Sequence, residues 1–297
     1  MDSWLHDLLK TRLHRPFLSA AGHIAQRISH RRAGSGQEID ERALTESLVD
    51  MLDAGTPGNV WGPLLEELKE LGLSLNTKVR KSTRESKTGA DLGITLERAI
   101  FERHTSSQTT YSALFQAKRI DMSGRIEDFF HTVGPAAAKQ SQLMLDITPA
   151  SFYLIYADTH YLKFYSAFEP SVFLNIAKGC SSPVWNAGCF EFSGKIADFL
   201  PNDELGCASG LLVVPATAVQ AVSSGGKGIC IRDLLPNCLP FWYWFVELFL
   251  PGFVGDPREK VRTIAQNVYS PSAREAADTP EGPFHVQFSY TLRVGNG

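Results

Sequence analysis

Two short stretches of the sequence decide the expected fold: Gly89-Ala90-Asp91-Leu92-Gly93-Ile94 and Phe115-Gln116-Ala117-Lys118-Arg119. Asp91 opens a strand-like apolar run, and the second stretch closes another such run. The chain between them suits one hairpin, which would lay the two strands side by side. Because side chains alternate along a strand, Gln116 and Lys118 would share one face of the sheet, with Asp91 within reach across the strand pair.

The chain around this hairpin predicts a mixed α/β fold, with a central mixed sheet flanked by helices. Amphipathic patterns predict helices at 40–52, 63–71 and 135–145. Strand-like runs are found at 73–79, 91–101, 111–118, 151–157, 161–168, 210–215 and 285–294. The polar residues 104–110 are expected to form the turn of the hairpin.

This order of elements divides the chain into three expected parts. Residues 1–37 form a basic helical segment, residues 38–168 form the α/β core, and residues 169–297 form a C-terminal extension. The basic residues of the first part fit a solvated helix face, an arm that contacts phosphates, or a helix that binds a partner protein.

The composition is that of an ordinary folded protein, with 43% hydrophobic residues, 21% charged residues and a net charge of -3 over 297 residues. This charge excludes a chain that is basic throughout, so a nucleic-acid site would have to be a local patch. The cysteines form no C-x-x-C pair, which predicts reduced and mostly buried thiols rather than a zinc site. They are Cys180, Cys189, Cys207, Cys230 and Cys238.

The longest apolar stretch covers residues 239–254 and is interrupted by Pro240, Pro251 and Glu247. Such a stretch is too short and too broken for a membrane span, and it predicts a buried helix or a dimer contact. The aromatic run at 241–245 fits either of these. The start of the chain lacks a cationic segment followed by an apolar one, so a cytoplasmic protein without a signal peptide is expected.

Asp91, Gln116 and Lys118 together suit the hydrolysis of a phosphodiester bond. Mg²⁺ prefers oxygen ligands, which the Asp91 carboxylate, the Gln116 side chain and the Ala117 carbonyl would supply. Lys118 would position the attacking water or stabilise the charge that develops on the phosphate. A further carboxylate is expected from the helix at 40–52, where Glu46 is the choice.

At these positions the sequence resembles the PD-(D/E)xK superfamily of restriction-endonuclease-like nucleases, in the D…QxK form of Mrr-type enzymes and bacterial anti-phage effectors. The resemblance covers roughly residues 38–160 and rests on Asp91, on Gln116 with Lys118, and on the order of helices and strands. It implies a restriction-endonuclease-like core in which Asp91, Gln116 and Glu46 bind Mg²⁺ or Mn²⁺ and Lys118 serves the nucleophile. Gln116 stands where the commonest form of the motif has an acid, and a neutral amide binds a metal less tightly.

The resemblance also implies a substrate and further contacts. The substrate would be double-stranded DNA, and the protein would act in bacterial defence. Basic residues around the expected site would contact backbone phosphates: Lys78, Arg80, Lys81, Arg84, Lys87, Arg119 and Arg125. On the helix at 135–145, Gln140 and Gln142 would either touch metal-bound water or substrate, or face solvent.

Two other functions stay open from the sequence. Gln116 in place of an acid also fits a non-catalytic module that binds nucleic acid or a partner protein on the same fold. Residues 169–297 fit a sensor that binds a small-molecule activator or a partner protein and switches the nuclease. Aromatic residues are enriched at interfaces, so the run at 241–245 would allow a homo-oligomer.

Overall fold

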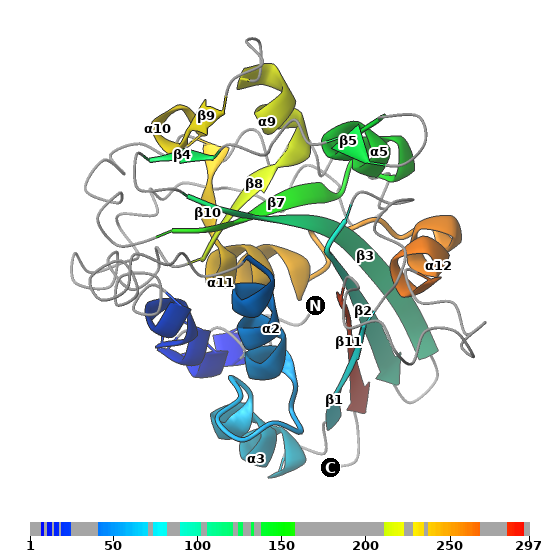
Figure 1. Cartoon of the computed structure of the whole chain (residues 1–297). Helices are drawn as coiled ribbons and strands as arrows, with labels where there is room; N and C mark the ends of the chain where they lie inside the picture. The colour runs from blue at the N-terminus through cyan, green and yellow to red at the C-terminus, as the bar shows by residue number, and fades with distance from the viewer. Residues whose placement is uncertain are drawn as a thin grey trace, which may run out of the picture.

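A seven-stranded mixed sheet runs through the protein in the order β1-β11-β2-β3-β7-β8-β10 (Figure 1). Its strands are β1 (Ser74–Lys81), β2 (Leu92–Phe101), β3 (Ser106–Arg119), β7 (Ser151–Tyr156), β8 (Leu211–Pro215), β10 (Leu239–Pro240) and β11 (Phe284–Arg293). Two short pairs lie outside it: β4 (Arg125–Ile126) with β9 (Ile229–Cys230), and β5 (Thr132–Val133) with β6 (Ala138–Lys139).

Helices lie on both sides of this sheet, and the expected mixed α/β class is confirmed. They are α2 (Glu41–Leu52), α3 (Gly62–Glu70), α5 (Gln140–Ile147), α9 (Ala216–Val222), α10 (Ile231–Leu234), α11 (Phe241–Tyr243), the π-helix η5 (Trp244–Phe249) and α12 (Glu259–Asn267). The computed structural model describes residues 7–8, 11–13, 15–17, 19–24, 41–70, 74–81, 90–101, 106–120, 124–126, 132–133, 138–157, 211–222, 228–234, 237–267 and 284–293.

The expected hairpin is formed by β2 and β3, which pair antiparallel with Leu92 opposite Phe115. The Asp91 backbone N–H donates to the Phe115 carbonyl at 2.8 Å, so the pairing extends one residue further and sets Asp91 across from Gln116. The turn expected at 104–110 is wrong in part, because β3 already begins at Ser106. Pairing with β2 uses only backbone groups, so a polar sequence at the more exposed end of a strand is no obstacle to it.

Strand β7 lies parallel to β3, and α5 is the helix of the crossover between them. The helix expected at 135–145 begins later, at Gln140, because residues 138–139 pair as β6 with β5. The strand expected at 151–157 is β7, and all six of its residues are buried. The further strand expected at 161–168 lies outside the described residues.

The C-terminal part of the chain contributes to the same sheet. Strand β11 lies between β1 and β2, antiparallel to the first and parallel to the second, while β8 and β10 extend the other side. The expected boundary between a core at 38–168 and an extension at 169–297 therefore passes through the sheet. Sequence periodicity finds a strand such as β11, but it carries no information on which strand will be its neighbour.

Odd and even positions of β3 face two different cores. Phe115 and Ala117 belong to the larger cluster, which α2, α3, α11 and η5 cover (Figure 1). Leu114 belongs to the smaller cluster, together with residues of α5 and α9. The alternation expected for Gln116 and Ala117 is therefore the arrangement found, since Ala117 is buried in the larger core.

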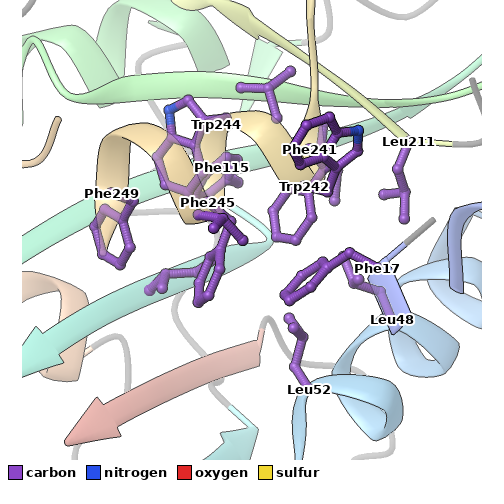
Figure 2. Close-up of a cluster of buried hydrophobic side chains, with 14 of the residues drawn as sticks. Phe17, Leu48, Leu52, Phe115, Leu211, Phe241, Trp242, Trp244, Phe245 and Phe249 are labelled. Carbon is purple, nitrogen blue, oxygen red and sulfur yellow. The ribbon is translucent and has the colours of Figure 1, made fainter. Parts of the chain in front are cut away.

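Aromatic side chains from the run at 241–245 fill the larger core (Figure 2). Trp244 lies edge-on to Phe115, with ring centroids 4.9 Å apart, and stacks on Phe249 at the same distance. All five residues of the run are buried against the sheet, so it forms core rather than an exposed interface. Of the cysteines, Cys238 is buried and both Cys230 and Cys238 are free thiols, while the other three lie outside the described residues.

The N-terminal segment also packs against this core. Its described residues between 7 and 24 are helical, and their buried positions follow helical spacing: Leu13, Phe17, Ala20, Ala21 and Ile24. Phe17 stacks on Phe245 with ring centroids 5.2 Å apart, so the apolar side of the segment is part of the fold. Across the described ranges, no helix combines the length and the apolar character that crossing a membrane requires.

Candidate functional site

Asp91 and Gln116 meet across the β2–β3 pair. The Gln116 Nε2 group donates a hydrogen bond to Asp91 Oδ2, and the Ala117 backbone N–H donates to the same oxygen at 2.8 Å. Gln116 is almost fully buried, whereas Asp91 is half-buried. The structure therefore brings together the acid and the amide that the sequence singled out.

The other amide atom of Gln116 has a different environment. Among the described residues, Gln116 Oε1 has no hydrogen-bond partner, although it is buried. A buried acceptor without a donor costs about 1–3 kcal/mol, so such atoms mark places where a ligand, a water or an ion can bind. The Gln116 side chain thus turns its nitrogen toward Asp91 and keeps a buried oxygen without a donor among the described residues.

Lys118 lies two residues further along the same face of β3 and is 5% exposed. Its Nζ atom lies 3.7 Å from Glu41 Oε2, and the other Glu41 oxygen accepts a hydrogen bond from the Arg119 backbone N–H at 2.8 Å. Glu41 is the first residue of α2, so this pair joins the start of that helix to the end of β3. The Glu41 carboxylate thus holds this buried lysine side chain at the end of β3.

Glu41, not Glu46, is therefore the helix carboxylate that the structure brings to Lys118. Glu46 forms an ion pair with Arg42 one helical turn earlier, with the two charged groups 3.6 Å apart. Five residues along a helix turn the side chain by roughly 140°, so Glu41 and Glu46 point in different directions. The sequence pattern could have indicated Glu41, because its helical spacing puts it on the same face of α2 as the buried Leu48 and Leu52.

Two buried tyrosines of β7 lie near the acidic groups. The Tyr156 hydroxyl donates to Thr45 Oγ1 at 2.8 Å, and Tyr153 is the register partner of Gln116. Burial raises the pKa of Tyr156, against the opposing effect of the Thr45 hydrogen bond, and the charges of Asp91 and Glu41 raise it further. Burial likewise raises the pKa of Tyr153, with a hydrogen bond from Ser141 opposing it and Asp91 adding to it. Both tyrosines therefore stay neutral at physiological pH.

The two glutamines of α5 have different positions. Gln140, the first residue of the helix, is 2% exposed and adjoins Ser141, which interacts with Tyr153. Gln142 faces solvent, where it donates to Asp146 Oδ1 at 2.6 Å and accepts from Gln220 Nε2 at 3.2 Å. Of the two alternatives for these residues, a surface position fits Gln142, and only Gln140 is buried on the same side as the site.

The expected phosphate-binding residues are described only in part. Arg119 continues β3 beyond Lys118, and exposed Arg125 donates to the Gly228 carbonyl at 2.6 Å. Strand β1 carries three more, Lys78, Arg80 and Lys81, and its last residue pairs with the first residue of β11, which in turn pairs with Leu92. The C-terminal end of β1 therefore lies at the same end of the strands as Asp91. Arg84 and Lys87 lie outside the described residues.

The side-chain oxygen atoms of Asp91, Gln116 and Glu41 define what the site can bind. Within the described ranges, no three His, Cys, Asp or Glu side chains gather as a metal site. The Asp91 carboxylate and Gln116 Oε1 nevertheless supply two hard-oxygen donors, and the Glu41 carboxylate lies beside Lys118. Two or three protein oxygens suit an ion that keeps several of its waters, as Mg²⁺ does.

Comparison with known proteins adds no assignment to this geometry. The chain matched no protein-family model, no curated protein and no solved structure.

Proposed function

We propose that this protein is a metal-dependent nuclease that hydrolyses phosphodiester bonds in double-stranded DNA. The observation that carries the proposal is the joining of Asp91 and buried Gln116 across two strands, with the Lys118 ammonium on the same face and paired with Glu41. An acid, an oxygen-bearing amide and a buried cation at one end of these strands can bind a divalent ion and stabilise the charge that develops in phosphodiester hydrolysis.

The order of elements supports the same proposal. Along residues 41–156 the elements are helices α2 and α3, strands β1 to β3, the two-residue strands β4 to β6, helix α5 and strand β7. Apart from α3 and β4 to β6, this is the order expected from the resemblance to a restriction-endonuclease-like core, and both halves of the D…QxK motif lie on the β2–β3 hairpin. The role in bacterial defence rests on this resemblance alone.

The donor set fits Mg²⁺ or Mn²⁺. Asp91 and Gln116 Oε1 would hold the ion, with Glu41 replacing Glu46 as the candidate helix carboxylate and the Ala117 carbonyl as a further oxygen. When bound, such an ion would lower the pKa of a coordinated water and stabilise negative charge on the phosphate. Calcium is larger and takes longer, looser bonds, so it is expected to bind without supporting cleavage.

Lys118 has a separate role in this proposal. Its amino group lies in a nearly buried position, where electrostatic interactions are stronger than in water. It would orient the attacking water and stabilise the charge that develops on the scissile phosphate. Glu41 holds the ammonium beside β3 and so keeps it in position.

One observation favours the alternative of a non-catalytic binding module. Gln116 Nε2 donates to Asp91 Oδ2, which turns the amide nitrogen rather than the oxygen toward the carboxylate. In a binding module that arrangement would be permanent, and the basic residues would bind nucleic acid without cleavage. The two functions therefore differ in whether any cleavage depends on Asp91.

The test is plasmid cleavage by the wild type and by Asp91→Ala, in Mg²⁺, Mn²⁺, Ca²⁺ or chelator. The wild type should cut in Mg²⁺ or Mn²⁺ only, and Asp91→Ala should abolish cutting while circular dichroism shows an intact fold. Asp233→Ala, which removes an exposed carboxylate on α10, is the matched control and should cut normally. Full activity of Asp91→Ala, or a wild type that binds DNA but never cuts it, would favour the binding module.

A further inference from the structure

The two ends of the Gln116 side-chain amide have unequal partners. Its nitrogen donates to Asp91 Oδ2 and lies 3.5 Å from the Ala117 carbonyl oxygen. Its oxygen, which is buried, accepts no hydrogen bond from the described part of the chain. Among the described residues, this side chain, which is 2% exposed, thus satisfies its donor and leaves its acceptor without a donor.

The charge of Asp91 dictates this orientation. A carboxylate only accepts hydrogen bonds, so the Gln116 nitrogen attracts it and the Gln116 oxygen would repel it. The same Asp91 oxygen also accepts from the Ala117 backbone N–H at 2.8 Å, so two N–H groups converge on one carboxylate atom. In the protein without a cation, leaving Gln116 Oε1 without a donor is the smaller of the two costs.

A divalent cation beside Asp91 would reverse that preference. The ion attracts oxygen and repels an N–H donor, and hard-oxygen ligands are the ones that Mg²⁺ prefers. A half-turn about the terminal bond of the side chain exchanges the two amide atoms without moving the strand, and this torsion has a broad, two-fold profile. Reversal therefore needs no backbone movement in a closely packed sheet.

We propose that the Gln116 amide reverses when a divalent cation binds: its nitrogen holds Asp91 in the metal-free protein, and its oxygen ligates the ion in the metal-bound one. This inference rests on the proposed metal site. It gives a physical reason for Gln at a position where an acid would bind the metal more tightly. A glutamate in its place would set two carboxylates against each other whenever the ion is absent, whereas Gln116 keeps the metal-free site intact.

Thermal unfolding with and without the ion tests the reversal. We would compare wild type, Gln116→Glu and Asp91→Ala in chelator and in MgCl₂, with NaCl added to equal ionic strength. Gln116→Glu should lower the melting temperature in chelator by roughly 3–6 °C, and Mg²⁺ should restore it. Its Mg²⁺ affinity should rise roughly 10-fold, because the site gains a charged oxygen ligand.

Gln142 provides a matched control. Its amide also donates to a carboxylate, Asp146 at 2.6 Å, but this pair is exposed on α5. Gln142→Glu should change the melting temperature by less than about 1 °C, because solvent screens exposed like charges. It should respond to Mg²⁺ as the wild type does.

A direct measurement covers the case in which Gln116→Glu does not fold. The two side-chain N–H resonances of Gln116 in ¹⁵N-labelled wild type are recorded during a MgCl₂ titration. Loss of the hydrogen bond to Asp91 should shift both resonances, whereas those of Gln142 should stay in place.

The outcomes separate the two proposals. An Mg²⁺ response that disappears in Asp91→Ala, together with moving Gln116 resonances, supports the reversal. The same Asp91-dependent response with fixed Gln116 resonances overturns the reversal and leaves the metal site standing. A response that Asp91→Ala does not change overturns both, because no ion then binds at Asp91.

Discussion

Asp256 and Asp91 both hydrogen-bond to β3, at different points along the strand, and their surroundings differ. Asp256 is fully buried and exchanges two backbone hydrogen bonds with Ser112, at 3.0 and 2.8 Å. Asp91 is half-buried and meets the same strand at Gln116 and Ala117. We call the first group, with Thr148 and Arg258, the Asp256 corner, and the second, with Lys118 and Glu41, the Asp91 site.

The Asp256 corner contains its own counter-charge. Arg258 contacts the Asp256 carboxylate at 2.5 Å through Nη2, donates to it from its backbone N–H at 2.9 Å, and Thr148 adds a hydroxyl donor at 2.7 Å. In the Asp91 site, the donors that reach Asp91 from β3 are neutral N–H groups. Asp256 therefore holds the fold together through its arginine, whereas Asp91 hydrogen-bonds to the amide that the proposed metal site uses.

The largest expected effect is on the stability of the Asp256 corner. Asp256→Ala should lower the free energy of unfolding by roughly 3–4 kcal/mol, because the buried Thr148 hydroxyl and the Arg258 backbone N–H lose their acceptor. Asp91→Ala should lower it by about 1–2 kcal/mol at most, since water can reach the half-buried groups it leaves. Urea unfolding of both variants checks this, and equal losses would remove the distinction between the two aspartates.

The next effect concerns catalysis by Lys118 in the Asp91 site. Lys118→Ala should still bind duplex DNA but cut it at least ~100-fold more slowly, the usual order for the loss of one electrostatic catalytic group. Lys118→Arg should not restore the rate, because a broad guanidinium is a poor substitute for a compact ammonium beside a water. Binding and single-turnover cleavage at two salt concentrations measure the two effects separately.

Arg125→Ala is the matched control for that experiment. Arg125 is an exposed basic residue, so its loss should weaken binding in a way that lower salt reverses. If lower salt also restores cleavage by Lys118→Ala, Lys118 only anchors phosphate. The Asp91 site would then be a binding surface.

The hairpin and its acid–amide pair could be predicted from the sequence because both depend on local patterns. Strand alternation sets Gln116 on the face opposite Phe115, and one hairpin is enough to bring Asp91 across from it. The helices near 40–52 and 63–71 are found at α2 and α3, since amphipathic spacing is also local.

The features that could not be predicted depend on distant partners. Strand β11 lies between β1 and β2, and nothing in its alternation says so. The aromatic run at 241–245 fitted an interface as well as a core, and only its contacts with Phe115 and Phe17 decide between them. Glu41 is a different case, because its spacing from Leu48 was visible but its nearness to Lys118 was not.

A smaller effect is expected at the turn that carries Asp256 to β3. Gly252 has a φ of 82°, and a Cβ atom there would lie 2.7 Å from the buried Tyr111 ring. Gly252→Ala should therefore lower the free energy of unfolding by about 2 kcal/mol, through backbone strain and overpacking. Gly58 has a similar φ of 78°, but an added Cβ atom there would meet nothing within 4 Å. The control Gly58→Ala should therefore lower the free energy of unfolding by only about 1 kcal/mol. Equal losses in thermal unfolding would mean that the turn tolerates the added methyl group.

The smallest expected effect distinguishes two carboxylates of α2. Glu41 touches Lys118 and the backbone of Arg119, while Glu46 pairs with Arg42. Glu41→Gln should slow cleavage roughly 10-fold, because the amide keeps the hydrogen bond to β3 but no longer holds the ammonium by charge. Its effect on stability should stay below about 1 kcal/mol, since Glu41 is one-third exposed and solvent weakens the pair.

Glu46→Gln is the control for the same helix and should cut as the wild type does. Single-turnover rates and duplex binding, measured side by side, give the readout that a merely structural role would not change. If Glu41 holds Lys118 in place, Glu41→Gln should slow single-turnover cleavage while binding duplex DNA as tightly as the wild type, because the group that it misplaces acts on the reacting phosphate. If Glu46→Gln slows cleavage and Glu41→Gln does not, the carboxylate that serves the Asp91 site is the one predicted from the sequence, and the ion pair between Glu41 and Lys118 has no part in catalysis.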